Sequence, residues 1–448
     1  MIQVFDLTKR YGDQLIFDAI TFALGRGERV GLVGRNGHGK STLFRLILRE
    51  EDPDEGRIMW PTRYRIGHLE QHVEFVADTV LAEGCLALPP EERDLEYKVE
   101  AIMAGLGFSE DDLSRPPAEL SGGFQIRLKL GKLLLSEPDL LLLDEPTNYL
   151  DIASISFIEE YLSAYPGGIL VVSHDRYFLE ANLVQSRVKL LEKMGGKEEL
   201  SRIESLDFQF SEIPFHAKTM MEIQRLAFGY PLSDRGGGNG QDGGRLLFED
   251  LTFSIEHDDR IGVIGRNGKG KSTLLRLLAG ELEPVKGVIK RHDDIRLGYF
   301  GQTNISRLTP SLTVEEEIQW ANNNLGRTQV RGICGAMMFT GERAEKRISV
   351  LSGGEKSRTL LGKILAQPSN LLLLDEPTSH LDMDSIEALI DAVRQYSGAV
   401  VIVTHSELIL KQLATKLVYF RAGAIGTYGG GYEDFLDFIG WDDEQEVY

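Results

Sequence analysis

Two segments of the chain combine the residue types and the spacing that bind phosphate. The sequences GRNGHGKS (34–41) and GRNGKGKS (265–272) both satisfy the pattern G-x-x-x-x-G-K-[ST], and each follows an apolar run. The glycines let backbone N–H groups turn toward phosphate oxygens, and the helix that begins at the lysine adds its positive dipole end. A glycine turn without a ligand is the alternative for one match, but two matches favour two nucleotide sites. The expected nucleotide-binding residues are Gly34, Arg35, Asn36, Gly37, His38, Gly39, Lys40, Ser41 and Thr42, with Gly265, Arg266, Asn267, Gly268, Lys269, Gly270, Lys271, Ser272 and Thr273 in the second copy.

An acidic pair ends the sequence LLLLDE in each copy. The pairs are Asp144 with Glu145 and Asp375 with Glu376, and each aspartate stands 104 residues after the lysine of its phosphate loop. A carboxylate at a strand end can hold the shell of a Mg²⁺ ion, and a neighbouring glutamate can orient or deprotonate an attacking water. Such a pair alone would be interpreted as a strand end that caps a helix. The phosphate loop in the same copy favours the catalytic interpretation.

Other polar residues recur in both copies with weaker individual signals. Ser-Gly-Gly opens a helix at 121–123 and 352–354, which predicts either an anion-binding helix start or an ordinary cap. His174 and His405 end apolar strands, where a histidine is more often structural than functional. The remaining candidates are Gln71 and Gln302, which have no signal of their own, and Tyr11 and Tyr230, which could stack on a base or simply be exposed.

These motifs belong to one internal repeat with a constant offset. Lys40 and Lys271 are 231 residues apart, and the same offset relates the two acidic pairs and the two histidines. Two copies of a whole domain therefore share the chain, since a solenoid repeat would have a period of only about 20–50 residues.

Each copy must contain strands and helices that bring its motifs together. The runs RVGLVG (29–34) and RIGVIG (260–265) enter the glycine loops and predict buried strands. After Ser-Gly-Gly, Leu130, Leu133 and Leu134 follow the i, i+3, i+4 spacing of a helix. Strands that alternate with helices predict an α/β fold with a mostly parallel sheet in each copy.

The copies differ near the middle and the end of the chain. After His405 the second copy continues through two predicted strands and a closing helix, whereas the first copy lacks these closing strands. Val184, Val188 and Leu191 have helical spacing, and Gly195-Gly196 would end that helix. The second copy also has twelve extra residues near 231–244, which predict a surface loop. The expected boundaries are a first domain at 1–179, a helical linker at 180–219, a second domain at 220–440 and an acidic tail at 441–448.

Composition limits the class of protein. The chain has 448 residues, with 49 Lys and Arg against 69 Asp and Glu, so its net charge of −20 argues against global attraction to nucleic acid or anionic lipid. Its two cysteines, Cys85 and Cys334, exclude a disulfide framework and a cysteine-rich zinc module. Its apolar runs are far shorter than the roughly 20 residues of a membrane span, and its start shows no secretory signal. We therefore expect a cytoplasmic protein without membrane insertion.

The order of phosphate loop, glutamine, LSGG, LLLLDE and histidine, found twice, resembles the ATP-binding cassette superfamily. The sequence DEPTN-x-LD in the first copy, and two cassettes on one chain, are similar to the ABC-F subfamily of cytosolic translation-associated ATPases. The resemblance covers nearly all of 1–179 and 220–440. It implies two tandem P-loop NTPase (ABC ATPase) domains joined by a short helical linker, and hydrolysis of ATP with Mg²⁺ as cofactor.

The resemblance also implies residue roles. Tyr11 and Tyr230 would stack on adenine, while Glu145 and Glu376 would be the catalytic carboxylates, with His174 and His405 as γ-phosphate sensors. The sites would be crossed within one monomer, so that each Ser-Gly-Gly segment binds the γ-phosphate held by the lysine of the other cassette. The Ser-Gly-Gly residues are Ser121, Gly122 and Gly123 with Ser352, Gly353 and Gly354, and the metal shell would comprise Ser41, Gln71, Asp144, Ser272, Gln302 and Asp375.

The chain departs from the subfamily in its signature and its linker. Phe124 stands where the second copy has Glu355, and the second histidine lies in THSE in place of SHDR. Similar proteins carry a long charged helical hairpin between the cassettes, and here only a remnant, QSRVKLLEKM, is present. The truncated linker weakens the implied partnership with ribosomal RNA and tRNA more than it weakens the ATP chemistry.

Two functions stay open. The first is a ribosome-associated translation factor ATPase, and the second is the energising ATPase subunit of an ABC transporter, because transporter ATPases are often separate chains. DEPTN and the hairpin remnant favour the first. A chromosome or DNA-repair ATPase is a weak third interpretation, since only 81 positions separate Lys40 from Ser121 and leave no room for a long insertion.

Overall fold

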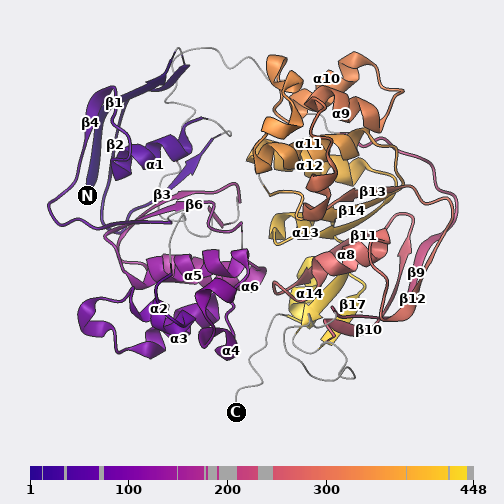
Figure 1. Cartoon of the computed structure of the whole chain (residues 1–448), viewed down its shortest axis with the longest axis horizontal. Coiled ribbons are helices and arrows are strands. Elements are labelled where there is room, and N and C mark those ends of the chain that lie inside the picture. Colours follow the sequence, from indigo (N-terminus) through magenta and orange to yellow (C-terminus); the bar gives the residue numbers. More distant parts are fainter. Residues whose placement is uncertain are drawn as a thin grey trace. The chain divides into compact units, whose positions relative to one another are not determined.

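The two copies of the repeat fold as two units, Met1–Arg202 and Ile203–Tyr448, and the division falls inside the expected linker (Figure 1). This computed structural model describes residues 1–12, 14–34, 38–69, 75–148, 150–175, 178–179, 189–190, 209–230, 246–379, 381–421 and 424–440.

A mainly parallel sheet forms the centre of each unit. The strand order is β5-β6-β7-β3-β8 in the first unit and β13-β14-β15-β11-β16-β17 in the second, where only β17 runs antiparallel to its neighbour. The apolar residues at 140–143 and 371–374 are buried on both faces of the sheet, as continuous leucine runs predict. The strands are β3 (Arg29–Val33), β5 (Ile66–His68), β6 (Leu140–Asp144), β7 (Gly168–Val172) and β8 (Lys189–Leu190), with β11 (Arg260–Gly265), β13 (Leu297–Phe300), β14 (Leu371–Asp375), β15 (Ala399–Val403), β16 (Lys416–Arg421) and β17 (Ala424–Tyr428). The predicted α/β fold is confirmed.

A small antiparallel sheet covers the phosphate-loop helix of each unit. The strand orders are β2-β1-β4 and β10-β9-β12. The inner side chains of the first sheet pack in one cluster with helix α1 (Lys40–Leu48), and those of the second pack with α8 (Lys271–Ala279). The strands are β1 (Ile2–Tyr11), β2 (Gln14–Leu24), β4 (Glu55–Met59), β9 (Thr219–Phe228), β10 (Phe248–Glu256) and β12 (Lys286–Arg291).

Helices form the rest of each unit. The helix predicted after Ser-Gly-Gly is α5 (Gly122–Leu135), and its Leu130, Leu133 and Leu134 are buried. Its counterpart is α11 (Gly353–Ala366). The other helices are α2 (Val80–Cys85), α3 (Glu96–Gly105), α4 (Glu110–Leu113), α6 (Ile152–Ala164), α9 (Val314–Ala321), α10 (Arg327–Ala336), α12 (Met383–Gln395), α13 (Glu407–Leu413) and α14 (Tyr432–Phe438). None of the helices in the described ranges has the length and apolar content needed to cross a membrane.

The closing edge of the first unit corrects one expectation. Lys189 and Leu190 pair with β3 as the strand β8, in the place that β16 takes beside β11. A helix through Val188 and Leu191 was expected, but an open sheet edge offers N–H and C=O groups that a strand satisfies and a helix cannot. The first unit therefore keeps part of the closing edge. Val184, Val188, Leu191, the loop at 231–244 and the tail at 441–448 lie outside the described residues.

Candidate functional site

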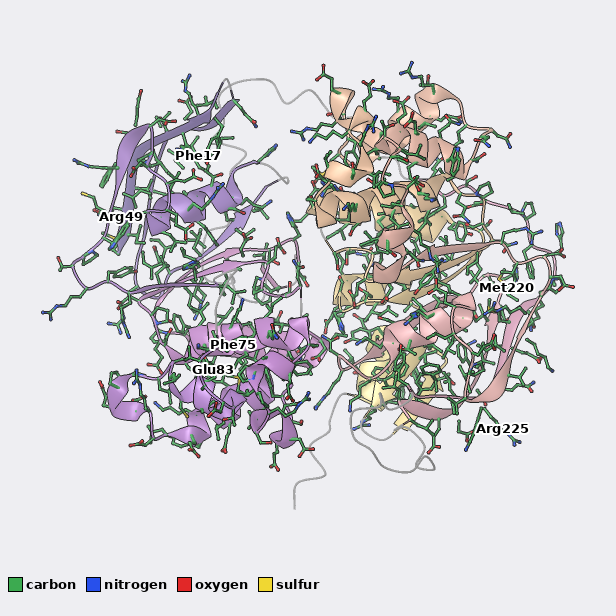
Figure 2. All side chains as sticks on the ribbon, in the orientation of Figure 1. Phe17, Arg49, Phe75, Glu83, Met220 and Arg225 are labelled. Carbon is green, nitrogen blue, oxygen red and sulfur yellow. The ribbon has the colours of Figure 1, made fainter. Side chains whose placement is uncertain are left out.

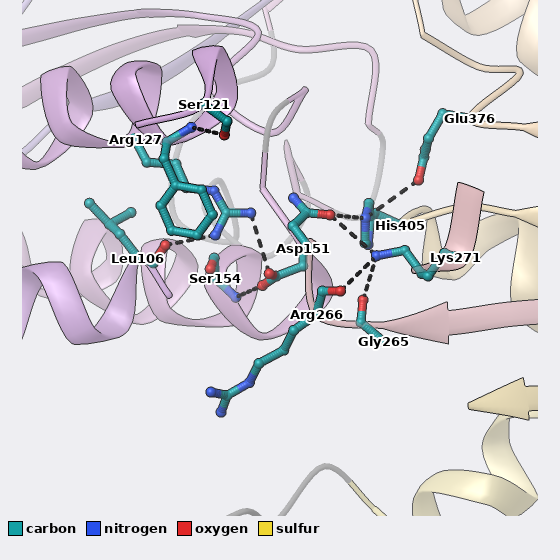
Figure 3. Close-up of polar contacts among 12 residues, drawn as sticks. Leu106, Ser121, Arg127, Asp151, Ser154, Gly265, Arg266, Lys271, Glu376 and His405 are labelled. Atoms are coloured by element: carbon teal, nitrogen blue, oxygen red, sulfur yellow. Dashed lines mark hydrogen bonds and ion pairs between the residues drawn. The ribbon is translucent and has the colours of Figure 1, made fainter. Parts of the chain in front are cut away.

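The phosphate loop of the second unit surrounds its lysine with oxygen atoms. Lys271 is buried at the start of α8, and its Nζ donates to the backbone oxygens of Gly265 (2.7 Å) and Arg266 (3.1 Å) and to Oδ1 of Asn267 (3.2 Å) (Figure 3). Gly270 has a φ of +105°, a left-handed backbone conformation that favours glycine. The loop thus places the ammonium group of Lys271 at the N-terminus of α8, as the sequence predicts.

The first unit repeats this arrangement. Lys40 Nζ donates to the backbone oxygen of Gly34 (2.5 Å) and lies 3.4 Å from Nε2 of His174. Gly39 has a φ of +84°, and a Cβ there would lie 2.3 Å from Cγ2 of Ile16, so the loop requires glycine at this position. Arg35, Asn36 and Gly37 lie outside the described residues.

The serine after each lysine contacts the aspartate at the end of a central strand. Ser41 Oγ donates to Asp144 (3.0 Å) and Ser272 Oγ donates to Asp375 (3.1 Å). Burial raises the pKa of both aspartates, although these hydrogen bonds act in the opposite direction. One hydroxyl and one carboxylate fit Mg²⁺, which keeps several waters and binds substrate phosphates in nucleotide sites. In the described part of the chain, no group of three or more His, Cys, Asp or Glu side chains could hold a metal by itself. Gln71 and the side chain of Gln302 lie outside the described residues.

A glutamate and a histidine face each other in both units. Oε1 of Glu145 lies 3.5 Å from Nε2 of His174, and the matching distance between Glu376 and His405 is also 3.5 Å (Figure 3). Burial raises the pKa of Glu145 to about 8 and shifts that of Glu376 in the same direction. Nε2 of His405 also lies 2.9 Å from Oδ1 of Asn267, whereas His174 approaches Lys40 directly. The structure therefore places each predicted acid and histidine beside its own phosphate loop.

The Ser-Gly-Gly segments begin α5 and α11. Ser121 accepts a hydrogen bond from the N–H of Phe124 (3.5 Å), and Ser352 accepts one from the N–H of Glu355 (3.3 Å). Glu355 returns the bond by accepting from the N–H of Ser352 (2.9 Å), which completes a capping box that the start of α5 lacks. A Cβ added at Gly122, Gly123 or Gly353 would meet no atom within 4 Å. These helix starts therefore leave room for an incoming ligand.

A buried arginine explains why phenylalanine is accommodated at position 124. The guanidinium of Arg127 donates to the backbone oxygen of Leu106 (2.8 Å) and to Asp151 (3.3 Å), and it lies 5.0 Å from the ring centre of Phe124 (Figure 3). Asp151 in turn caps α6 by accepting from the N–H of Ser154 (3.1 Å). Arg127 and Asp151 are not among the site residues that the sequence predicts. Their repetition at offset 231, as Arg358 and Asp382, is the signal that could have revealed them.

The two tyrosines are half-exposed and have different partners. Tyr11 donates its hydroxyl to Glu51, whereas the hydroxyl of Tyr230 accepts from Arg276 (3.2 Å). Leu282 stands at the position that corresponds to Glu51. Tyr11 and Tyr230 have exposed fractions of 42% and 46%. Lys9 lies over the ring of Tyr11 and Phe228 packs edge-on against that of Tyr230, so stacking on adenine stays a prediction.

Comparison with known proteins identifies the class. The ABC transporter family model matches residues 17–148 and 248–379, which together are more than half of the chain and contain both phosphate loops. The chain therefore belongs to the ATP-binding cassette family, as a member with two cassettes, and it is an ATPase.

Relatives match over almost the whole chain. The ATP-binding protein YbiT of Escherichia coli O157:H7 is 31% identical over 96% of this chain and 98% of its own length. ABC transporter F family member 5 of Arabidopsis thaliana is 29% identical over 97% of this chain and 77% of its own length. The alignment with YbiT spans 520 positions, more than the 448 residues here, so YbiT has additional residues within the matched span. That difference agrees with a truncated linker.

Solved structures support the fold. The archaeal ribosome recycling factor aABCE1, in complex with the ribosomal stalk protein aP1, has a TM-score of 0.70 and 22% identity over 96% of this chain and 90% of its own. A structure described as RNase-L Inhibitor also has a TM-score of 0.70, with 21% identity over 96% of this chain and 92% of its own. Both show that the tandem-cassette architecture recurs in known proteins.

Proposed function

We propose that this ATPase is a cytoplasmic translation factor of ABC-F type that acts on the ribosome. The observation that carries the proposal is the match of two fused cassettes, almost end to end, to relatives that include F-family members. The likeness to a structure described as a ribosome recycling factor agrees with it. The transporter-subunit alternative is less favoured, because the F-family match includes both cassettes.

The chain's own residues suggest how each site works. Lys40 and Lys271 bind phosphate, and the serine–aspartate pairs would hold Mg²⁺, which would neutralise phosphate charge. Glu145 and Glu376 orient the attacking water and accept its proton, while His174 and His405 contact the γ-phosphate. In the crossed arrangement of one monomer, Ser121, Gly122 and Gly123 serve the ATP at Lys271, and the Ser352 segment serves the ATP at Lys40.

The ATP chemistry is tested with paired variants. Glu145→Gln with Glu376→Gln should keep about two bound ATP per chain and lower turnover about 10²–10⁴-fold, because Gln keeps the shape but cannot take a proton. Ser352→Arg should impair hydrolysis at the site that contains Lys40. Normal hydrolysis at Lys40 in that variant would exclude the crossed arrangement.

The partner is tested with the same double Gln variant, which keeps ATP bound. It should sediment with ribosomes at low salt in ATP but not in ADP, and it should not sediment with lipid vesicles. Absence of ATP-dependent sedimentation with ribosomes at any salt concentration would reject the ribosomal role.

A further inference from the structure

A glutamate of the helical part is completely buried in each unit, although glutamate is almost never fully buried without a partner. Glu83 of α2 and Glu317 of α9 both have an exposed fraction of 0%. Neither residue belongs to the sites described above. Their partners show what each carboxylate joins.

In the first unit, Glu83 connects the segment that follows Gln71 with helix α5, which begins at the Ser-Gly-Gly motif. Its Oε2 accepts from the backbone N–H groups of Val76 (2.9 Å) and Ala77 (2.8 Å), which follow Gln71 closely in the chain. Its Oε1 accepts from Nζ of Lys132, a residue of the signature helix α5. Phe75 lies 6.0 Å from the same ammonium group, and Figure 2 labels Phe75 and Glu83 in the helical part of this unit.

The second unit reproduces the contact. Glu317 accepts from the N–H of Thr309 (3.2 Å) and from Nζ of Lys363 (2.6 Å) in α11. Lys363 lies 231 residues after Lys132, but the carboxylate follows Gln71 by 12 positions in one copy and Gln302 by 15 in the other. The same pair therefore forms across connecting segments of different length, which indicates a requirement for the contact itself.

The contact of Glu83 with Lys132 is stabilised by the opposite charges of the two side chains. Burial alone would raise the pKa of Glu83, but the hydrogen bonds from Lys132, Ala77 and Val76 outweigh burial and the pKa is lowered. The carboxylate thus stays ionised and keeps all three donors. An ionised pair with backbone partners on one side and a helix on the other resists independent movement of the two segments.

We propose that Glu83 with Lys132, and Glu317 with Lys363, are positioning pairs. Each pair makes the segment that follows Gln71 or Gln302 move together with α5 or α11 when nucleotide binds. The inference rests on the proposed crossed sites. There Gln71 belongs to the ATP at Lys40 and Ser121 to the ATP at Lys271, so the pair in one cassette links the occupancy of both sites. Its role is to couple the sites, and it does not touch the reacting atoms.

Hydrogen exchange provides a test that does not depend on turnover. In the Glu145→Gln, Glu376→Gln background, ATP should protect the amides of 75–77 and of 121–125 with the same midpoint concentration. After Lys132→Met, the two midpoints should separate by about fivefold or more, within the usual range of coupling between sites. Lys132→Arg, which keeps the cation, should restore a common midpoint.

A surface pair in the same helical part supplies the matched control. Lys98 Nζ lies 2.5 Å from Glu92, and both side chains are about one-third exposed. Lys98→Met should leave both midpoints and the ATP dependence of hydrolysis unchanged, whereas Lys132→Met in the otherwise wild-type chain should reduce cooperativity in ATP. Lys363→Met provides a second test should Lys132→Met fail to fold, as judged by thermal unfolding.

The outcomes separate the two proposals. A folded Lys132→Met or Lys363→Met chain with a common midpoint and unchanged cooperativity overturns the positioning role, even when the wild type hydrolyses ATP normally. Protection of 121–125 that is independent of the nucleotide at Lys271 would instead remove the crossed-site basis of the proposed function.

Discussion

Glu145 and Glu376 are held in conformations that few glutamates adopt. Their φ angles are 48° and 49°, in the left-handed region that is uncommon outside glycine. A backbone hydrogen bond to the neighbouring strand fixes each of them, with the N–H of Glu145 donating to the oxygen of Val172 (2.8 Å). Strained residues of this kind gather at functional sites, where the surrounding structure holds them in place. Each carboxyl is therefore held beside the histidine of its own unit, as the proposed role toward water requires.

The raised pKa values of Glu145 and Glu376 predict that the rate of ATP hydrolysis depends on pH. Because burial raises the pKa of Glu145 to about 8 and that of Glu376 in the same direction, both are largely protonated at pH 7 before nucleotide binds. A general base acts only when deprotonated, so kcat/KM should rise with pH across pH 6–8 and level off above about 8. Steady-state hydrolysis from pH 5.5 to 9 measures this.

The double Gln variant should lose the rising limb of that profile. A wild-type profile that is flat between pH 6 and 8 would show that neither glutamate acts as the base in the free enzyme.

Three elements of the first unit meet at Arg127. The residue belongs to α5, bonds the carbonyl of Leu106 at the end of α3, and pairs with Asp151 at the start of α6. Burial lowers the pKa of Arg127 and Asp151 opposes this shift, so the cation depends on its partner. The helix that Ser121 caps is thus tied to the segment that follows Glu145.

Removing that cation should destabilise the first unit strongly. Arg127→Met removes the cation that faces the buried carboxylate of Asp151 and should cost about 3–5 kcal/mol in the free energy of unfolding. The unfolding transition of the first unit in urea measures this change in free energy. Arg127→Met with Asp151→Asn should cost less than Arg127→Met alone, and a larger loss in the double variant would contradict the pairing.

The sequence predicts some of these elements better than others. The central strands and α5 follow from continuous apolar runs and helical leucine spacing, so their motifs fall where expected. Strand β1 is harder to predict, because its pairing with β2 shifts register between Val4 and Leu7, and Asp6 and Ala19 have positive φ. Such bulges break the alternation that identifies a strand. Arg127–Asp151 and Glu83–Lys132 depend on tertiary packing, which local spacing does not reveal.

At the scale of the whole molecule, charge and linker length act together. Binding to ribosomal RNA requires Lys and Arg to neutralise phosphates, and that contribution weakens as salt rises. The chain has a net charge of −20, and its linker at 185–206 has five Lys and Arg against four Glu, so the linker supplies no basic run. The proposed ribosomal role therefore predicts weak contact between RNA and this linker.

We expect this chain to bind ribosomes weakly even when ATP is trapped by the Gln pair. Inserting a basic helical hairpin with the remaining closing strands between Asn182 and Leu183 should strengthen binding and make it more salt-dependent. Co-sedimentation across a salt series measures both forms, with an equally long neutral hairpin as the control. Tight, ATP-dependent binding by the short chain would show that the cassettes themselves carry the contacts.

The identical strands β6 and β14 have a consequence for how the chain reaches its native state. Both have the sequence LLLLD, and both pair in parallel with a buried strand. While the chain folds, either strand could therefore pair in the sheet of the other unit. On the ribosome that makes it, the first cassette can complete its sheet before the second copy has been synthesised, because domains generally fold as they emerge. When the denatured chain is diluted from denaturant, both copies begin to fold at the same time. Recovered ATPase should then fall below that of the freshly made protein, and the order of synthesis would resolve an ambiguity that the duplicated sequence contains.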